Sequence, residues 1–240
     1  MKMRAYAYGI GLQFRLDIRS KNLLLTCYLV PLLFFALMGG IFTSVMPQMK
    51  ETLIPSMIVM GVSMGALIGV PPTVCELYGT DIQKVYQANG APLHFGLLSL
   101  GVSAFCHLMI MSAVILAAAP IAFGASLPEH LPAYAGKTAL LILASLGVAG
   151  VLGLLVKEQA KLTMVCQIAF LPSILLSGIL FPANLLPEFL QKAGKIFPAF
   201  WGFRFMSERG AGLRNAIPLA GIFVCAVIGW ALLLRRRKNR

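Results

Sequence analysis

Six apolar runs of roughly membrane-spanning length decide what this chain can fold into. A transmembrane helix needs about 20 mostly apolar residues, and none of the six runs contains an Asp, Glu, Lys or Arg. Lipid offers the backbone no hydrogen bonds, so an uncharged run of this length crosses a membrane as a helix. The runs are residues 23–46, 53–74, 93–119, 139–156, 162–181 and 217–234. We therefore predict an all-α integral membrane protein with six transmembrane helices, in one transmembrane domain over residues 1–240.

The charge of the chain favours a membrane as partner rather than a nucleic acid. Charged residues make up 12% of the sequence, against about 25% in soluble proteins. The net charge is +12, but ten basic residues lie in two terminal clusters, 2–21 and 235–240, beside apolar runs. Such clusters suit an anionic membrane surface. We expect the lipid bilayer as a partner and no nucleic acid.

The distribution of basic residues predicts the orientation. An even number of spans puts both termini on one side, and Lys and Arg concentrate in cytoplasmic segments. With the termini inside, 13 of the 20 basic residues are cytoplasmic, and five of the remaining 7 lie in a single outer loop. We predict a multi-pass protein of a bacterial cell membrane with cytoplasmic N and C termini and a basic cytoplasmic tail at 235–240.

The N-terminal segment 1–22 supports two interpretations. Its apolar residues alternate from Tyr6 to Ile18, which is a strand-like period. An isolated strand at a membrane surface would leave its backbone unpaired. We therefore predict a cytoplasmic helix lying in the membrane interface, with Arg15 and Arg19 on one face.

Small residues and prolines mark the second span. Gly61, Gly65 and Gly69 repeat every four positions, and such stripes let helix backbones approach closely. We interpret the stripe as a packing seam toward another span or another subunit; the alternative is the ordinary glycine richness of membrane helices. Pro71 and Pro72 follow, and we expect them to disrupt the helix as it leaves the membrane.

The outer loop 183–216 carries helix signals and many aromatic residues. Pro187 and Glu188 are typical of the first turn of a helix, which we expect to run to about Ile196. Five aromatic residues follow between positions 197 and 205, and aromatic side chains concentrate at the lipid–water interface. We predict short re-entrant helices that dip into the outer leaflet between spans five and six.

We find no constellation for covalent chemistry. The five cysteines are scattered, so we expect no disulfide and no metal site. Lys137 and Thr138 follow Gly136 as at the end of a phosphate-binding loop, but Leu131 stands where that motif needs a glycine. The spans contain no paired carboxylates. We therefore predict no catalytic, cofactor-binding or metal-ligating residue.

Two polar side chains within the spans, His107 and Gln167, are candidates for a transport pathway. Ionisable groups inside a membrane often mark such paths. For His107 we favour a buried side chain bonded to neighbouring hydroxyl or backbone groups, and Ser103 one turn earlier could pair with it. A proton-sensing or cargo-lining role is the alternative, which the absence of a carboxylate within the spans disfavours.

Two segments resemble a known family. The inner loop 75–92 contains Cys75-Glu76-Leu77-Tyr78-Gly79-Thr80-Asp81-Ile82-Gln83-Lys84 and ends with Gly90-Ala91-Pro92. The end of the fifth run reads Leu176-Ser177-Gly178-Ile179-Leu180-Phe181-Pro182. In this order relative to the six spans, they resemble the acidic–Gly–Thr–basic and Ser-Gly-x-x-Phe-Pro segments of type-2 ABC transporter permeases. One departure is Ala91 where the family usually has Thr.

The resemblance implies a permease subunit of an ABC exporter that works as a dimer, either homodimer or pair of paralogues. Two cytoplasmic ABC ATPase subunits would bind ATP and Mg and drive it, and this chain would bind no cofactor itself. The segment 76–84 would be the coupling helix seated on the ATPase, through Glu76, Gly79, Thr80, Asp81 and Lys84. The second motif would precede the outer re-entrant helices, through Ser177, Gly178, Phe181 and Pro182.

The cargo and one competing function remain open at this point. Few polar residues lie in the spans, which favours amphipathic or lipophilic cargo such as a drug, a peptide or a lipid-linked molecule. Without the resemblance, residues 76–89 would equally be an ordinary solvated loop. The whole chain would then fit a non-transporting assembly or peptide-immunity factor, which needs no ATPase.

Overall fold

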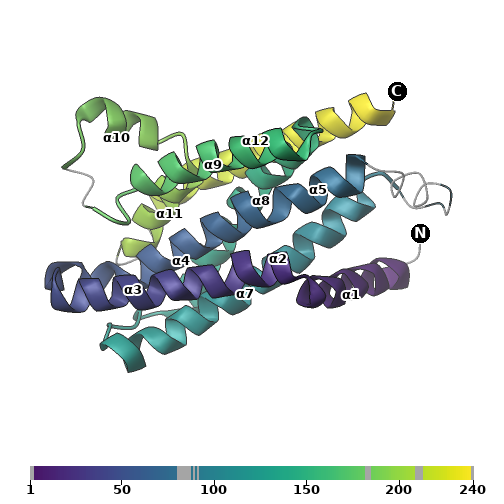
Figure 1. Ribbon diagram of the computed structural model, residues 1–240. Helices are drawn as coiled ribbons and strands as arrows, with labels where there is room; N and C mark the ends of the chain where they lie inside the picture. The colour runs from purple at the N-terminus through teal and green to yellow at the C-terminus, as the bar shows by residue number, and fades with distance from the viewer. Residues whose placement is uncertain are drawn as a thin grey trace.

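The computed structural model describes residues 3–79, 88, 90, 92–181, 185–208 and 213–238. Within these ranges every regular element is a helix, which confirms the predicted all-α fold. The long helices lie side by side along one axis (Figure 1). The start of α1 (Met3–Arg19) and the end of α12 (Leu213–Lys238) lie at the same end of this bundle, here called the terminal end, and α10 (Glu188–Gly194) lies at the opposite, far end.

The N-terminal segment is helical, so the interpretation as a helix rather than a strand is confirmed. Ser20 separates α1 from the first span, and its hydroxyl accepts a hydrogen bond from the backbone N–H of Leu23 at 3.4 Å. The first span then consists of α2 (Lys21–Leu24), the π-helical turn η1 (Leu25–Leu29) and α3 (Val30–Ser44).

One face of α1 packs on α7 (Phe95–Phe123). The rings of Tyr6 and Phe95 meet edge to face with centroids 5.1 Å apart. A second stripe on α1, Tyr8, Leu12 and Leu16, is exposed. The helix therefore uses one side to hold the bundle and leaves an apolar side available to lipid.

The second span is the central helix of the bundle. It consists of η2 (Pro47–Thr52), α4 (Leu53–Met64), the π-helical turn η3 (Gly65–Gly69) and α5 (Val70–Gly79). Every residue of α4 except Met64 is buried. A helix that is apolar on all sides needs neighbours on all sides, and α3, α7, α8 (Leu131–Leu155) and α9 (Gln159–Leu175) supply them.

The prediction that Pro71 and Pro72 disrupt this span is wrong. Both lie inside α5, which runs to Gly79, five residues beyond the predicted end of the span. The π-helical turn η3 comes immediately before α5 and interrupts the α-helical hydrogen-bond ladder there. The two prolines therefore stand in the first turn of α5, where their missing N–H groups break few bonds.

Five helices in the described part of the chain are long and apolar enough to cross a membrane, compared with the six predicted spans. They are Leu25–Ser44, Pro47–Gly79, Phe95–Phe123, Leu131–Leu155 and Arg214–Arg236. The fifth predicted span corresponds to α9, which is apolar but has only 17 residues. It ends at Leu175, and Gly178 turns the chain beyond it with φ +89°.

Two short helices precede α12. α10 begins at Glu188, as predicted from Pro187, and ends at Gly194. α11 (Pro198–Ser207) begins with Pro198 at its first position, where a proline loses no helical hydrogen bond. α12 then packs on α8 and returns the chain to the terminal end.

Candidate functional site

The predicted coupling segment begins as the last turn of α5 at the terminal end. Glu76 and Gly79 are exposed there, and a Cβ placed on Gly79 would meet no other atom within 4 Å. Thr80, Asp81 and Lys84 lie outside the described residues. The described start of the segment is thus an accessible helix end that carries a carboxylate.

Tyr78 holds the two ends of this inner connection together. Its hydroxyl donates a hydrogen bond to the backbone carbonyl of Leu93 at 2.6 Å and accepts one from the N–H of Leu97 at 3.2 Å. The side chain of Tyr78 is buried. The end of α5 is therefore fixed to the start of α7.

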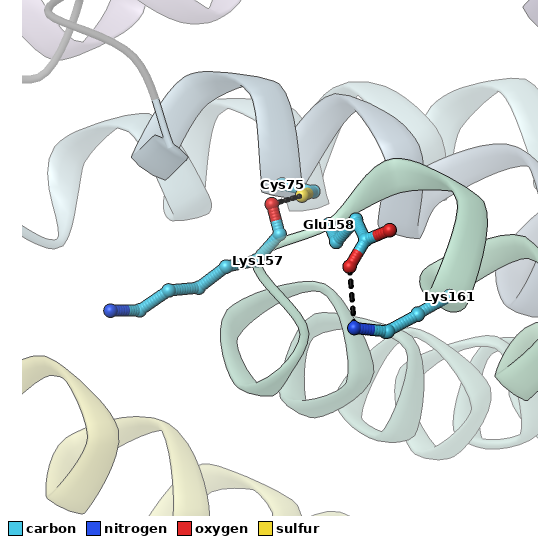
Figure 2. A network of polar contacts seen from close by, with 4 residues as sticks. All are labelled: Cys75, Lys157, Glu158 and Lys161. Carbon is cyan, nitrogen blue, oxygen red and sulfur yellow. Dashed lines mark hydrogen bonds and ion pairs between the residues drawn. The ribbon is translucent and has the colours of Figure 1, made fainter.

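Cys75 makes a second connection, to the turn between α8 and α9. Figure 2 shows its thiol directed at the backbone of this turn, where it donates to the carbonyls of Val156 at 3.3 Å and Lys157 at 3.5 Å. Glu158 and Lys161 form an exposed ion pair beside it, 2.6 Å between charged atoms. Among the described residues no three His, Cys, Asp or Glu side chains gather to hold a metal ion.

Close packing of α5 on α8 supports both connections. A Cβ on Gly153 of α8 would stand 2.6 Å from Cβ of Val74 and 2.9 Å from the backbone carbonyl oxygen of Pro71. Only a glycine allows the two backbones to come this close. The terminal end of the central helix is therefore held close against α8.

A buried carboxylate joins α1 to α7. Asp17 is 4% exposed. Its Oδ2 accepts a hydrogen bond from the hydroxyl of Ser103 at 2.5 Å, and its Oδ1 accepts one from the amide nitrogen of Gln13 at 2.8 Å. A buried carboxylate is costly unless its oxygens are bonded. The bond to Gln13 lies within α1, and the bond to Ser103 fixes where α1 sits along α7.

His107 lies one turn further along α7, in the same cluster. Its ring stacks on Phe14 of α1, centroids 4.4 Å apart, and its Nδ1 shares a hydrogen bond of 2.8 Å with the hydroxyl of Tyr28. Its Nε2 is buried and has no partner among the described residues. The possible pair of Ser103 and His107 does not form, because the Ser103 hydroxyl donates to Asp17.

Sequence reasoning missed Asp17, since it assigned the acidic residue to a solvated interfacial helix. A signal was available in the α-helical spacing. Gln13 and Asp17 lie four residues apart, and Arg15 and Arg19 occupy the exposed side of the same helix. Read at a helical period, the carboxylate falls on the face opposite the arginines, where a neighbouring helix has to satisfy it.

The glycine stripe faces helices of the same chain. A Cβ on Gly65 would stand 2.5 Å from a methyl carbon of Leu108 and 3.1 Å from the sulfur of Cys27, and a Cβ on Gly69 would stand 2.8 Å from the hydroxyl of Thr26. Gly61 meets Met111 and Pro31 in the same way. The stripe therefore lies between the central helix and both the first span and α7, and it brings the π-helical turns η1 and η3 together.

Gln167 lies on a different surface from His107. It is exposed on α9, next to a stripe of exposed apolar side chains that follows the helical period. The stripe consists of Met164, Ile168, Leu171 and Leu175, which are 50% to 70% exposed. The two predicted pathway residues are therefore not brought together: His107 is buried between α1 and α7, and Gln167 faces outward.

The motif at the end of α9 forms a tight turn. The hydroxyl of Ser177 donates to the carbonyl of Ile174 at 2.7 Å and accepts from the N–H of Ile179 at 3.3 Å. Gly178 has φ +89°, which favours glycine. Phe181 is 54% exposed, and Pro182 lies outside the described residues. The serine and glycine thus redirect the chain toward α10.

A polar cluster fixes α11 at the far end. Lys137 precedes the predicted fourth span, residues 139–156, but it lies inside α8 and is buried. Its Nζ donates to the backbone carbonyl of Glu208 at 2.9 Å and lies 5.2 Å from the ring centroid of Phe205. The carboxylate of Glu208 accepts a hydrogen bond from Asn215 of α12 at 2.5 Å.

Comparison with known proteins identifies the family. The family model for the ABC-2 type transporter matches residues 10–208, from α1 to the end of α11. A comparison with curated proteins gave no significant match. The matched region contains the predicted coupling segment, the Ser177–Gly178 turn and four of the five long apolar helices. The chain is a multi-pass membrane protein and belongs to the ABC-2 type transporter family.

Proposed function

We propose that this chain is the permease subunit of an ATP-driven ABC exporter. Two copies, or this chain and a paralogue, form the translocation path, and separate cytoplasmic ATPase subunits bind ATP and Mg and supply the energy. The family match carries this proposal. The terminal end faces the cytoplasm, which is the orientation that the positive-inside rule favours.

The two connections at the end of α5 support a coupling role for residues 76–84. Tyr78 links this segment to α7 through the 2.6 Å bond to Leu93. Cys75 links it to the turn that leads into α9 through the bond to Val156. A displacement of the segment by an ATPase would reach two spans through packed, hydrogen-bonded contacts, which is the kind of element that transmits coupling.

The exposed stripe on α9 supports a dimer. Ile168 and Leu171 face outward with Gln167 beside them. An amide inside a membrane is more stable when a neighbouring helix offers a hydrogen-bond partner. A second permease that covers α9 would supply that partner, and it would place Gln167 at the interface or in the path. The spans contain few other polar groups, which supports an amphipathic or lipophilic cargo. We propose that this cargo leaves the cell.

Co-purification tests the proposal. The tagged chain is purified from native membranes in mild detergent, and the proteins that accompany it are identified by mass spectrometry. The variant combines Glu76→Lys, Asp81→Lys and Lys84→Glu. The matched control combines Glu188→Lys and Lys192→Glu, which reverses an exposed ion pair of 2.8 Å at the far end.

We expect an ABC ATPase to accompany the wild type and the control but not the variant, while all three insert in the membrane and pair with a second permease. A variant that keeps its ATPase would contradict coupling through residues 76–84. A wild type that brings down no ATPase would contradict the exporter itself and favour an assembly or peptide-immunity factor.

A further inference from the structure

A groove opens at the terminal end between the start of α7 and the end of α12. Its volume is about 710 Å³, which is within the roughly 300–1,000 Å³ of ligand pockets. Its walls are mostly apolar. They include Leu93, Leu97 and Leu98 on one side and Val227, Ala231 and Leu234 on the other. Leu98 and Val227 are 43% and 40% exposed, so the groove is open along its length to the surroundings of the bundle.

Trp230 forms a fixed wall of this groove. Its indole N–H donates to the backbone carbonyl of Gly147 at 2.8 Å. The ring lies on Gly150, where a Cβ would stand 2.6 Å from it. The wall is therefore held in place by α8 before any ligand arrives, and little ordering remains to oppose binding.

The mouth of the groove is basic. Arg235 lines it, and Arg236 follows on the exposed end of α12. His94, whose Nε2 lies 3.3 Å from the hydroxyl of Tyr6, lines the opposite side. No acidic side chain lies among the described residues of the lining, and no described acidic side chain pairs with either arginine. Arg235 and Arg236 are both exposed at this mouth.

We propose that this groove binds an anionic phospholipid, with an acyl chain along Leu97 and Val227 and the phosphate beside Arg235. The arginine stands near the end of the apolar helix Arg214–Arg236, where the headgroup of a lipid lying along this helix would be expected. Basic pockets between helices on the cytoplasmic side of a membrane select anionic headgroups. A soluble anion would gain nothing from the apolar walls. A zwitterionic lipid also carries a phosphate, but its own cationic group offsets the attraction of the arginine, so a lipid with net negative charge is favoured.

The bound lipid would lie directly against the connection between the end of α5 and the start of α7. Leu93 lines the groove, and its carbonyl accepts the hydrogen bond from Tyr78. A lipid that holds α7 and α12 together would therefore steady the end of α5. This consequence rests on the proposed function, whereas binding to the groove does not.

Tryptophan fluorescence tests the site directly, because the chain has only two tryptophans. Trp201→Phe leaves Trp230 as the single reporter in the groove, and Trp230→Phe leaves Trp201 in α11 as the control. Each is reconstituted in vesicles of phosphatidylcholine that contain the same fraction of dibrominated phosphatidylglycerol or dibrominated phosphatidylcholine. Bromine quenches a neighbouring indole. Both leaflets have the same lipid composition, so the result does not depend on the orientation of the chain. The measurement requires neither transport nor an ATPase.

We expect Trp230 to be quenched more strongly by the anionic lipid, and Trp201 to be quenched equally by both. Arg235→Gln should remove this preference for anionic lipid. The affinity of the groove for phosphatidylglycerol relative to phosphatidylcholine should fall about fivefold. Arg214→Gln, at the other end of the same helix, should leave it unchanged. Ala231→Phe, which fills the groove, should reduce quenching by either lipid.

Two results would overturn the proposal. Equal quenching of Trp230 by the two lipids would mean an annular contact without headgroup selection. An absence of quenching by both would mean that another occupant, such as a second copy of the chain, covers the groove. Neither result would affect the co-purification of an ATPase, so failure of this site and failure of the exporter are distinguishable.

Discussion

The hydrogen bond between Asp17 and Ser103 should carry much of the attachment of α1 to α7. Both side chains are buried, 4% and 0% exposed, and their oxygens lie 2.5 Å apart. A hydrogen bond to a charged group contributes about 1.5–3 kcal/mol. Ser103→Ala removes this bond, and Asp17 then keeps only its bond to Gln13.

Asp17→Ala alone does not measure this contribution. It removes both bonds, but it also removes the cost of burying a carboxylate, and the two effects oppose each other. The Ser103 hydroxyl could also turn to a carbonyl of its own helix. A double-mutant cycle isolates the pair. We expect a coupling energy of about 1.5–3 kcal/mol between Asp17→Ala and Ser103→Ala.

Hydrogen exchange in detergent is the assay, because it measures the local opening of one helix separately from global unfolding. Loss of about 1.5–3 kcal/mol corresponds to roughly 10- to 150-fold faster exchange of the α1 amides, since 1.4 kcal/mol is about tenfold. The control is Arg15→Ala on the exposed side of α1, which should be additive with Ser103→Ala within about 0.5 kcal/mol. A coupling energy of only about 0.5 kcal/mol or less between Asp17→Ala and Ser103→Ala would refute the reasoning.

Two further predictions concern the packing of α5 and the orientation of the chain. Gly153→Ala should destabilise the protein by about 1–3 kcal/mol in a denaturant titration, because the new Cβ would meet the backbone carbonyl of Pro71, which cannot move aside as a side chain can. Gly136→Ala in the same helix meets nothing within 4 Å and should be neutral or stabilising by up to about 1 kcal/mol; equal effects of the two changes would contradict this account. In intact cells, Lys84→Cys and Arg236→Cys should resist a membrane-impermeant thiol reagent that labels Glu129→Cys and Gln191→Cys, measured against the background of the unmodified chain. Labelling of position 84 from outside would reverse the proposed orientation.

The apolar runs alone determined the fold class and the places of the long helices. Lipid cannot bond the backbone, so an uncharged run of about 20 residues, which is too long for a barrel strand, crosses a membrane as a helix. Local signals also located the start of α10 at Glu188, because a proline before an acidic residue suits a first helical turn. Signals at the ends of runs were weaker. Pro71 failed as a helix end because a π-helical turn, invisible in the sequence pattern, precedes it.

Only the tertiary structure decided which helices touch. The Asp17–Ser103 bond joins residues 86 positions apart, and the Cys75–Val156 bond joins residues 81 apart. Sequence patterns could not indicate these contacts, because in a membrane the side chains that face lipid and those that face another helix are equally apolar. Hydrophobic periodicity therefore locates a helix in the bilayer but does not orient it toward a partner. Here the close approach at Gly65 and Gly153 and the few buried polar bonds set that orientation.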